Sequence, residues 1–261
     1  MNKISPADLF SQTAANWILN LHEGLRDLCY RFFKCFIYDD RYQLYITGLK
    51  NTLILTFFAL LLGIVLGVVV SLVRVSWDKT HNEMHGPGKA ILGFFNGVSK
   101  VYLTVIRGTP VVVQLLIMNF VIFASSRNKV LVGALSFGIN SGAYVAEIVR
   151  SGIQSIDPGQ MEAGRSLGLN YVQTMWNIII PQAVKNILPA LGNEFIALLK
   201  ETSIVNVIGM KDITKWAINV QGRTYQAFMP FIGIALVYLV MVIILSKLVN
   251  LLERRLRSSE R

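Results

Sequence analysis

Long apolar stretches separated by short polar segments dominate this sequence, and the longest can cross a lipid bilayer. A bilayer core of about 30 Å needs roughly 20 helical residues. Residues 52–73 run without a single charged side chain. Further apolar stretches predict spans at residues 110–126, 130–149, 187–208 and 228–246. The pattern therefore predicts an all-α integral membrane protein with about five transmembrane helices.

Charged residues lie inside two of these predicted spans. Glu147 lies near the end of the third span. The fourth span contains Glu194, Lys200 and Glu201. A charge at such a depth is costly unless it faces protein or a wet cavity. These side chains are therefore candidates for a function inside the helix bundle.

The segment 1–45 ahead of the spans has a helical pattern of its own. Its apolar side chains recur at near-helical spacing from Trp17 through Leu21 to Phe32. This spacing predicts an amphipathic helix, lying either on the outer membrane surface or against the bundle. We expect residues 91–109 to form an interfacial stretch that leads into the second span.

Two local features predict how the spans begin and pack. Gly63 and Gly67 lie four residues apart in the first span, a spacing that permits close helix approach. The same spacing also fits ordinary glycine usage in a membrane helix. Pro110 suits the first turn of the second span. Arg107 just before it would anchor to lipid phosphate or act in a gate.

Charge modifies this picture by suggesting an orientation. The 261-residue chain has 15% charged residues and a net charge of +10, against about 25% charged in a soluble domain. No nucleic-acid-binding signature accompanies the charge, so we expect no nucleic-acid partner. The tail 253–261 holds four arginines and is expected in the cytoplasm. Five spans then place the N-terminus outside and the loops 74–109 and 150–186 in the cytoplasm.

No motif in the chain supports catalysis, a metal site or an ATP site. The stretch "HNEMH" at 81–85 lacks the spacing of a zinc protease. "GPGKA" at 86–90 lacks the first glycine and the hydroxyl residue of a phosphate loop. Cys29 and Cys35 fit neither a zinc nor a redox pattern and are expected to be unpaired thiols. We therefore expect no enzyme and no cofactor in this chain.

One polar stretch, "GQMEAGRSLGLNYVQTMWNIIIPQA" at 159–183, carries the most specific pattern. Asp157-Pro158 suits a helix start, which would place Glu162 in the first turn, and Gly168 permits a turn. Pro181 follows an apolar run and would bend the chain there. These residues alone predict a cytoplasmic helical hairpin.

The same stretch resembles the EAA loop of the permease subunits of binding-protein-dependent ABC importers. The resemblance rests on Glu162-Ala163-Gly164, Gly168 and Ile180-Pro181, with Gly164 and Ile180 as mild departures. "VIRGTPVVVQ" at 105–114 and "GLKNTL" at 48–53 extend it, and it resembles the polar amino-acid branch in particular. It covers residues from about 48 to 250, so we expect a permease domain at 46–252 with its coupling loop at about 155–183.

The resemblance implies a bacterial cytoplasmic-membrane importer. Its partners would be ABC ATPase subunits that use ATP and Mg²⁺, an external substrate-binding protein, a second permease subunit and membrane lipid. Glu162, Ala163, Gly164, Gly168 and Pro181 would couple to the ATPase, although Glu162 alone also fits a helix-end charge. The alternative is a secondary transporter driven by an ion gradient, although the chain lacks the internal repeat often found in that class.

Five polar residues are candidates for a substrate pocket. Asn140, Tyr144 and Glu147 share one face of the third span, and Glu194 and Glu201 share a face of the fourth. Carboxylates in a wet pocket would bind the ammonium of an amino acid and would favour a basic side chain. The structural alternative is an ion pair of Glu147 with the arginine three residues later.

Overall fold

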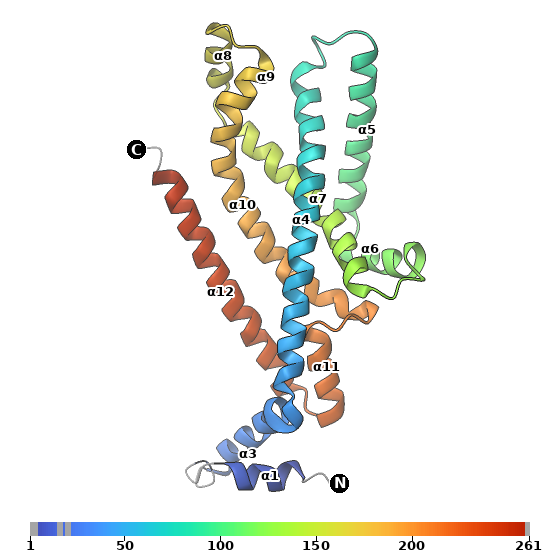
Figure 1. Ribbon diagram of the computed structural model, residues 1–261, viewed down its shortest axis with the longest axis vertical. Coiled ribbons are helices and arrows are strands. Elements are labelled where there is room, and N and C mark those ends of the chain that lie inside the picture. The colour runs from blue at the N-terminus through green and yellow to red at the C-terminus, as the bar shows by residue number, and fades with distance from the viewer. Residues whose placement is uncertain (1–4, 15–17, 19–21, 259–261) are drawn as a thin grey trace. The chain divides into compact units, whose positions relative to one another are not determined.

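Every element in the described part of the chain is helical. The computed structural model describes residues 5–14, 18 and 22–258 (Figure 1). These residues fall into two compact units. One unit contains Met1–Leu53 and Ser203–Met241, and the other contains Ile54–Thr202 and Val242–Arg261. Helices α4 (Tyr42–Thr80) and α12 (Phe228–Ser258) contribute to both.

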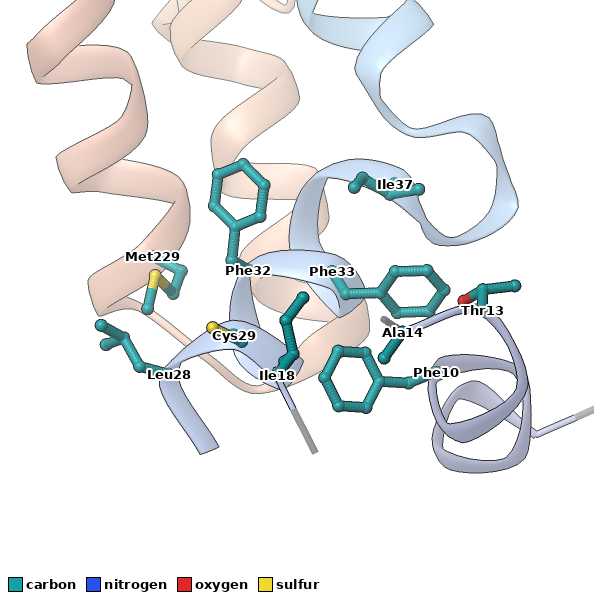
Figure 2. Close-up of a pocket in the computed structure, with 10 residues that line it drawn as sticks. All are labelled: Phe10, Thr13, Ala14, Ile18, Leu28, Cys29, Phe32, Phe33, Ile37 and Met229. Atoms are coloured by element: carbon teal, nitrogen blue, oxygen red, sulfur yellow. The ribbon is translucent and has the colours of Figure 1, made fainter. Parts of the chain in front are cut away.

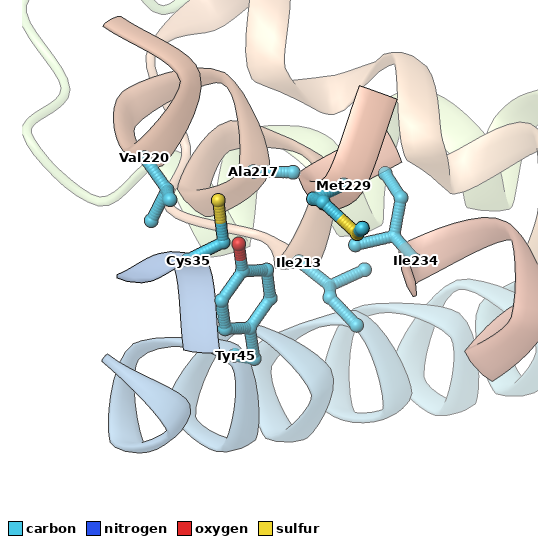
Figure 3. Packing of buried hydrophobic residues seen from close by; sticks show 7 residues of the cluster. All are labelled: Cys35, Tyr45, Ile213, Ala217, Val220, Met229 and Ile234. Carbon is cyan, nitrogen blue, oxygen red and sulfur yellow. The ribbon is translucent and has the colours of Figure 1, made fainter. Parts of the chain in front are cut away.

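The first unit is built on short helices that precede and connect the long ones. Besides the beginnings of α4 and α12 it contains α1 (Pro6–Thr13), α3 (Glu23–Phe32), η1 (Phe33–Ile37), η2 (Tyr38–Asp40), η5 (Thr202–Ile208) and α11 (Ile213–Thr224). Its core joins η1, α4, α11 and α12 (Figure 3), through Cys35, Tyr45, Ile213, Ala217, Val220, Met229 and Ile234.

The two cysteines are free thiols, as the sequence predicts. Cys35 is fully buried in the core of the first unit. Burial raises the pKa of the Cys35 thiol, and a raised pKa makes the thiol a poor nucleophile. Cys35 therefore acts as a small apolar core residue.

The second unit holds the remaining helices. They are the rest of α4 and α12 with α5 (Pro87–Gly108), α6 (Val111–Ile117), η3 (Met118–Ile122), α7 (Lys129–Gln154), α8 (Pro158–Ser166), α9 (Tyr171–Thr174), η4 (Met175–Ile179) and α10 (Ile180–Glu201). Helix α7 lies at the centre. A buried cluster joins it to α4, η4 and α10, through Val75, Val145, Val149, Ile153, Ile179, Ala183 and Ile187.

Glycines let α4 and α7 approach closely, as their spacing predicts. A Cβ on Gly67 would lie 2.6 Å from Val145, and one on Gly63 would lie 3.1 Å from Ser141. Since a Cβ at 2.6 Å would overlap its neighbour, only glycine fits at Gly67. The small-residue face of α4 is therefore a real helix contact.

The second span lies elsewhere than the sequence predicts. Among the described residues four helices are long and apolar enough to cross a membrane, namely α4, α5, α7 and Phe228–Leu256 of α12. Residues 110–126, predicted as a span, form only the seven-residue α6 and the five-residue π-helical η3. Residues 91–109, predicted as interfacial, belong almost entirely to the 22-residue α5. The prediction of a loop at 74–109 is therefore also wrong, apart from a turn between α4 and α5.

The fourth span is shifted relative to its predicted bounds. Helix α10 has 22 residues and ends at Glu201, and the following residues form the 3₁₀ helix η5. The predicted span 187–208 is therefore wrong at both ends. Helix α10 is less apolar than the four candidate spans, but it packs on α7 so closely that a Cβ on Gly152 would overlap Ile187.

The described part of the N-terminal segment contains two α-helices, α1 and α3, followed by the short η1 and η2. Helix α3 exposes Leu25, Leu28 and Phe32 along one side, which fits the amphipathic pattern. Trp17 and Leu21 of the predicted pattern lie outside the described residues. Arg261 of the predicted basic tail lies outside them too. The position of this segment on a membrane stays a prediction.

Candidate functional site

The loop between α7 and α10 begins with a well-capped helix. The Asp157 side chain accepts a hydrogen bond from the Gly159 N–H at 2.7 Å, and Pro158 opens α8. The predicted helix start is therefore confirmed. The prediction that Glu162 lies in the first turn is wrong, because it is the fifth residue of α8. Glu162 is exposed on the surface of the loop.

A glycine turn separates α8 from the next short helix. Gly168 has φ = +81°, a backbone conformation that favours glycine. Asn170 then caps α9 in a capping box with Gln173, with both hydrogen bonds at 2.9 Å. The chain continues through η4 into α10, where Pro181 lies in the first turn. The predicted hairpin turn at Gly168 is therefore confirmed.

The two short helices of this coupling loop pack tightly through Gly164. Gly164 is buried, and a Cβ on it would lie 2.5 Å from Thr174 Cγ2 and 2.8 Å from Thr174 Oγ1. The Thr174 hydroxyl donates to the Asn170 carbonyl at 3.0 Å, which limits its freedom to rotate away. Ala163 beside Gly164 is exposed.

The loop exposes three large apolar side chains among its polar ones. Leu167 is 80% exposed, and Val172 and Trp176 are each 70% exposed. They come from the end of α8, from α9 and from η4. Large apolar side chains that are exposed outside a membrane span are candidates for a protein–protein contact.

Hydrogen bonds tie the coupling loop to the spans beside it. Asn186 on α10 donates to the Ser155 hydroxyl at 2.8 Å, and Gln182 donates to Gln160 at 3.4 Å. The end of α4 also lies against the loop, because Asp78 and Met161 line one small cavity there. The α4–α5 turn and the α8–α9 hairpin lie at the same end of this unit (Figure 1). A force on the hairpin would therefore reach α10 and α7.

The three candidate pocket residues of α7 belong to a polar cluster between helices. The Asn140 side chain donates to Gln114 Oε1 of α6 at 3.0 Å. The Arg107 guanidinium lies 5.7 Å from the ring centre of Tyr144 and 3.9 Å from the Glu147 carboxylate. Arg107 of α5 thus contacts two side chains of α7.

Glu147 also forms the ion pair that the sequence predicts. An Arg150 nitrogen lies 2.5 Å from the Glu147 carboxylate, three residues along α7. Glu147 is therefore flanked by Arg107 on one side and by Arg150 on the other. Two guanidinium groups beside one carboxylate fix the orientation of that carboxylate.

The two candidate carboxylates of α10 have different surroundings. The Ser141 hydroxyl of α7 donates to Glu194 Oε1 at 2.7 Å. Glu201 is exposed at the end of α10. The contacts thus join Glu194 to α7 next to Asn140. Sequence reasoning missed Gln114 and Ser141, because both are ordinary polar residues whose partners lie on other helices.

Comparison with known proteins places this chain in one family. Residues 88–258 match the family described as "Binding-protein-dependent transport system inner membrane component". The arginine transport system permease protein ArtQ of Bacillus subtilis (strain 168) is 36% identical over 216 residues, covering 82% of this chain and 92% of ArtQ. A Rickettsia bellii relative whose name assigns it to glutamine transport is 35% identical over 214 residues, or 81% of this chain and 92% of that protein.

Solved structures agree with this match. A crystal structure of an amino acid ABC transporter with histidines has a chain with TM-score 0.72 and 46% identity, covering 82% of this chain and 94% of that one. An inward-facing MetNI methionine ABC transporter matches at TM-score 0.66 and 19% identity, covering 86% of this chain. At that identity the second match supports the fold alone.

Proposed function

We infer the function of this chain from its family, since it belongs to the inner-membrane components of binding-protein-dependent transport systems. We propose that it is the membrane-spanning permease of an ATP-driven importer that carries a polar amino acid across the bacterial cytoplasmic membrane. Relatives named for arginine and glutamine transport support the substrate class. The observation that carries the proposal is the coupling loop, a rigid helical hairpin with an exposed apolar surface.

The hairpin is the proposed contact for a separate ATPase subunit. Glu162 and Ala163 are exposed on α8, while Gly164 and Gly168 set the packing and the turn. Leu167, Val172 and Trp176 supply apolar area, which drives most protein association. Pro181 starts the helix that receives the force. The ATPase subunits bind ATP and Mg²⁺, and this chain supplies only the contact.

Further partners and the orientation follow from the same proposal. The coupling loop and the basic end of α12 face the cytoplasm, and the N-terminus lies outside, where a substrate-binding protein delivers the amino acid. A second permease, identical or similar, completes the pathway. Movement of the hairpin pulls on α10 through the Asn186–Ser155 and Gln182–Gln160 hydrogen bonds. The helix bundle then opens its substrate path alternately to the two sides of the membrane.

The polar cluster on α7 is the proposed substrate contact. Glu147 offers a carboxylate for an ammonium or guanidinium group, and Arg107 offers a partner for the substrate carboxylate. Asn140, Tyr144 and Glu194 present further polar atoms from the same helix and from α10. Glu201 would extend this acidic lining and favour a basic amino acid. As the helices move, contacts of the zwitterion with Arg107 and Glu147 would replace the contact between these two side chains.

Reconstituted transport tests the proposal. Proteoliposomes would hold this chain, its ATPase and its binding protein, with labelled arginine, histidine, glutamine, glutamate or cystine outside. We expect uptake that requires ATP and needs no ion gradient, and the preferred amino acid identifies the substrate. Uptake driven by an ion gradient and indifferent to ATP would favour a secondary transporter instead.

A further inference from the structure

The first unit contains an apolar cavity of about 730 Å³, and none of the proposed coupling or substrate residues lines it. It lies between α1, α3, η1 and the beginning of α12. Figure 2 shows Leu28 and Met229 on one side of it and Phe10 and Phe33 on the other. Its size falls within the range of small-molecule sites, about 300–1,000 Å³.

The side chains that line the cavity are partly buried walls and partly an exposed mouth. Phe10 and Phe33 on one side and Met229 on the other are each only 9% exposed and form the closed walls. The rings of Phe10 and Phe33 lie 5.5 Å apart, which fixes them against each other. Leu28, Phe32 and Ile37 line the same cavity but are about half exposed, so they form its mouth.

The lining excludes a polar ligand. Thr13 supplies the hydroxyl among the lining side chains, and this hydroxyl already donates to the Leu9 carbonyl at 2.8 Å. Cys29 adds a thiol, which is a weak hydrogen-bond donor. An amino acid or a charged peptide would lose its hydration here without compensation. The ligand must therefore be a hydrocarbon chain or another apolar group.

The surroundings of the mouth identify the source of that chain. The exposed apolar strip of α3 and η1 is followed along the sequence by exposed Tyr42 and Ile46 on α4. On the same unit α12 exposes Phe231, Ile232 and Leu236. These parts of α4 and α12 belong to membrane-spanning helices, whose exposed apolar side chains face lipid. Met229 of the lining lies within one turn of exposed Phe231 and Ile232 on α12, so we infer that the mouth opens toward lipid.

The polar side of the same helix pair fits a position at the membrane interface. A second hollow beside α1 and α3 is lined by Glu23, Arg26 and Asp27, and Phe10 is shared by both hollows. Helix α3 thus has charged groups on one side and the apolar mouth on the other. This arrangement is typical of a helix that lies in the interfacial plane.

We propose that this cavity binds one acyl chain of a membrane phospholipid, in the leaflet where α12 begins. The lipid would fasten the N-terminal helix pair to the membrane surface. This role is independent of the amino acid that the chain transports.

Photolabelling tests the proposal on the full-length chain. The chain is reconstituted in vesicles of phosphatidylethanolamine and phosphatidylglycerol, with part of the phosphatidylglycerol carrying a diazirine near the end of one acyl chain. After irradiation, labelled peptides are quantified, and peptides of lipid-facing α12 serve as the internal reference. We expect strong labelling of the cavity-lining peptides of α1, α3 and η1.

Matched variants separate a bound chain from general contact with lipid. Cys29→Trp fills the cavity from α3, and Thr13→Trp fills it independently from α1, in case one variant fails to fold. Leu25→Trp puts the same side chain on exposed α3 surface outside the lining. We expect the two filling variants to lose labelling of the lining while Leu25→Trp keeps it. Equal labelling in all variants, labelling confined to α4 and α12, or crosslinks of the lining to another protein chain would overturn the proposal.

Discussion

Gly164 of α8 lies directly against Thr174 of α9, and this contact holds the two short helices of the coupling loop together. A Cβ on Gly164 would come within 2.5 Å of the Thr174 methyl carbon. The family pattern often has alanine at this position, and here Thr174 occupies the space that the extra methyl group would need. The hairpin is thus rigid because a residue without a side chain permits its packing.

Substituting Gly164 by alanine should loosen the coupling loop. Overpacking of this kind costs about 1–3 kcal/mol, so Gly164→Ala should lower the unfolding temperature and ATP-driven uptake. Gly164→Ala combined with Thr174→Ala should recover part of both losses, because the two residues are in contact. Gly97→Ala on α5 is the control, since nothing lies within 4 Å of its Cβ position. Equal effects of Gly164→Ala and Gly97→Ala would contradict this account.

Removing the Trp176 side chain should weaken ATPase binding without destabilising the fold. Trp176 is 70% exposed, so little internal packing is lost. A buried interface tryptophan is worth about 2 kcal/mol or more, which corresponds to a roughly 30-fold rise in Kd. Binding of the purified ATPase to Trp176→Ala measures this, with exposed neighbour Asn177→Ala as control. Unchanged affinity would place the ATPase contact elsewhere on the loop.

Neutralising Glu194 tests its proposed place in the substrate pocket. Glu194→Gln keeps a side-chain oxygen that can accept the Ser141 hydrogen bond, so the fold should persist. Loss of a charged hydrogen bond to substrate, about 1.5–3 kcal/mol, should raise KM for uptake about 10- to 100-fold. Glu83→Gln in the exposed turn after α4 is the matched control. An unchanged KM would remove Glu194 from the pocket.

Asp212 caps α11 from a buried position, where ionisation of its carboxyl group costs desolvation free energy. Its two carboxylate oxygens accept from the Thr214 and Lys215 N–H groups at 3.0 and 2.9 Å. Burial nevertheless raises the pKa of the Asp212 carboxyl above its ordinary value. Asp212→Ala should lose about 1 kcal/mol of stability, whereas Asp212→Asn keeps an acceptor and should lose little.

The pH dependence of stability follows from the same shift. A carboxyl whose pKa is raised in the folded state adds most to the free energy of unfolding at pH values below its unfolded-state pKa. This stabilisation is lost as the pH rises through the folded-state pKa. The unfolding temperature of the wild type should therefore fall relative to that of Asp212→Asn as pH rises through the acidic range. Thermal unfolding in detergent at several pH values measures this. If the difference in unfolding temperature between the wild type and Asp212→Asn stayed constant with pH, Asp212 would not titrate in this way.

The sequence predicts the first span, the helix start at Asp157-Pro158 and the turn at Gly168 well, because each depends on neighbouring residues. Residues 52–73 contain no charge, and α4 there has a mean hydropathy of 3.0. Asp157-Pro158 and Gly168 determine a helix start and a turn through their own backbone chemistry. Such features need no knowledge of the rest of the fold.

The sequence-based prediction of the second span is wrong because it follows local hydropathy, whereas a span also needs an unbroken helix of sufficient length. Helix α5 includes Lys100 and Arg107, and its most apolar window reaches a mean hydropathy of only 1.2. Residues 110–126 are more apolar, yet their helix breaks into α6 and a π-helical turn. Likewise, Arg107 and Glu147 are 40 residues apart, and only the packing of α5 on α7 brings them together.

Reversing the charge of Glu162 tests the central claim most directly. Glu162 is exposed, so Glu162→Arg should fold and insert normally while disturbing the ATPase contact. The measurement is ATP-driven amino-acid uptake in proteoliposomes holding the ATPase and the binding protein, with Arg165→Glu on exposed α8 as a second charge reversal. Abolished uptake with the chain still present in the membrane is the predicted result. Full ATP-driven uptake by Glu162→Arg would contradict the assignment of this loop as the coupling element.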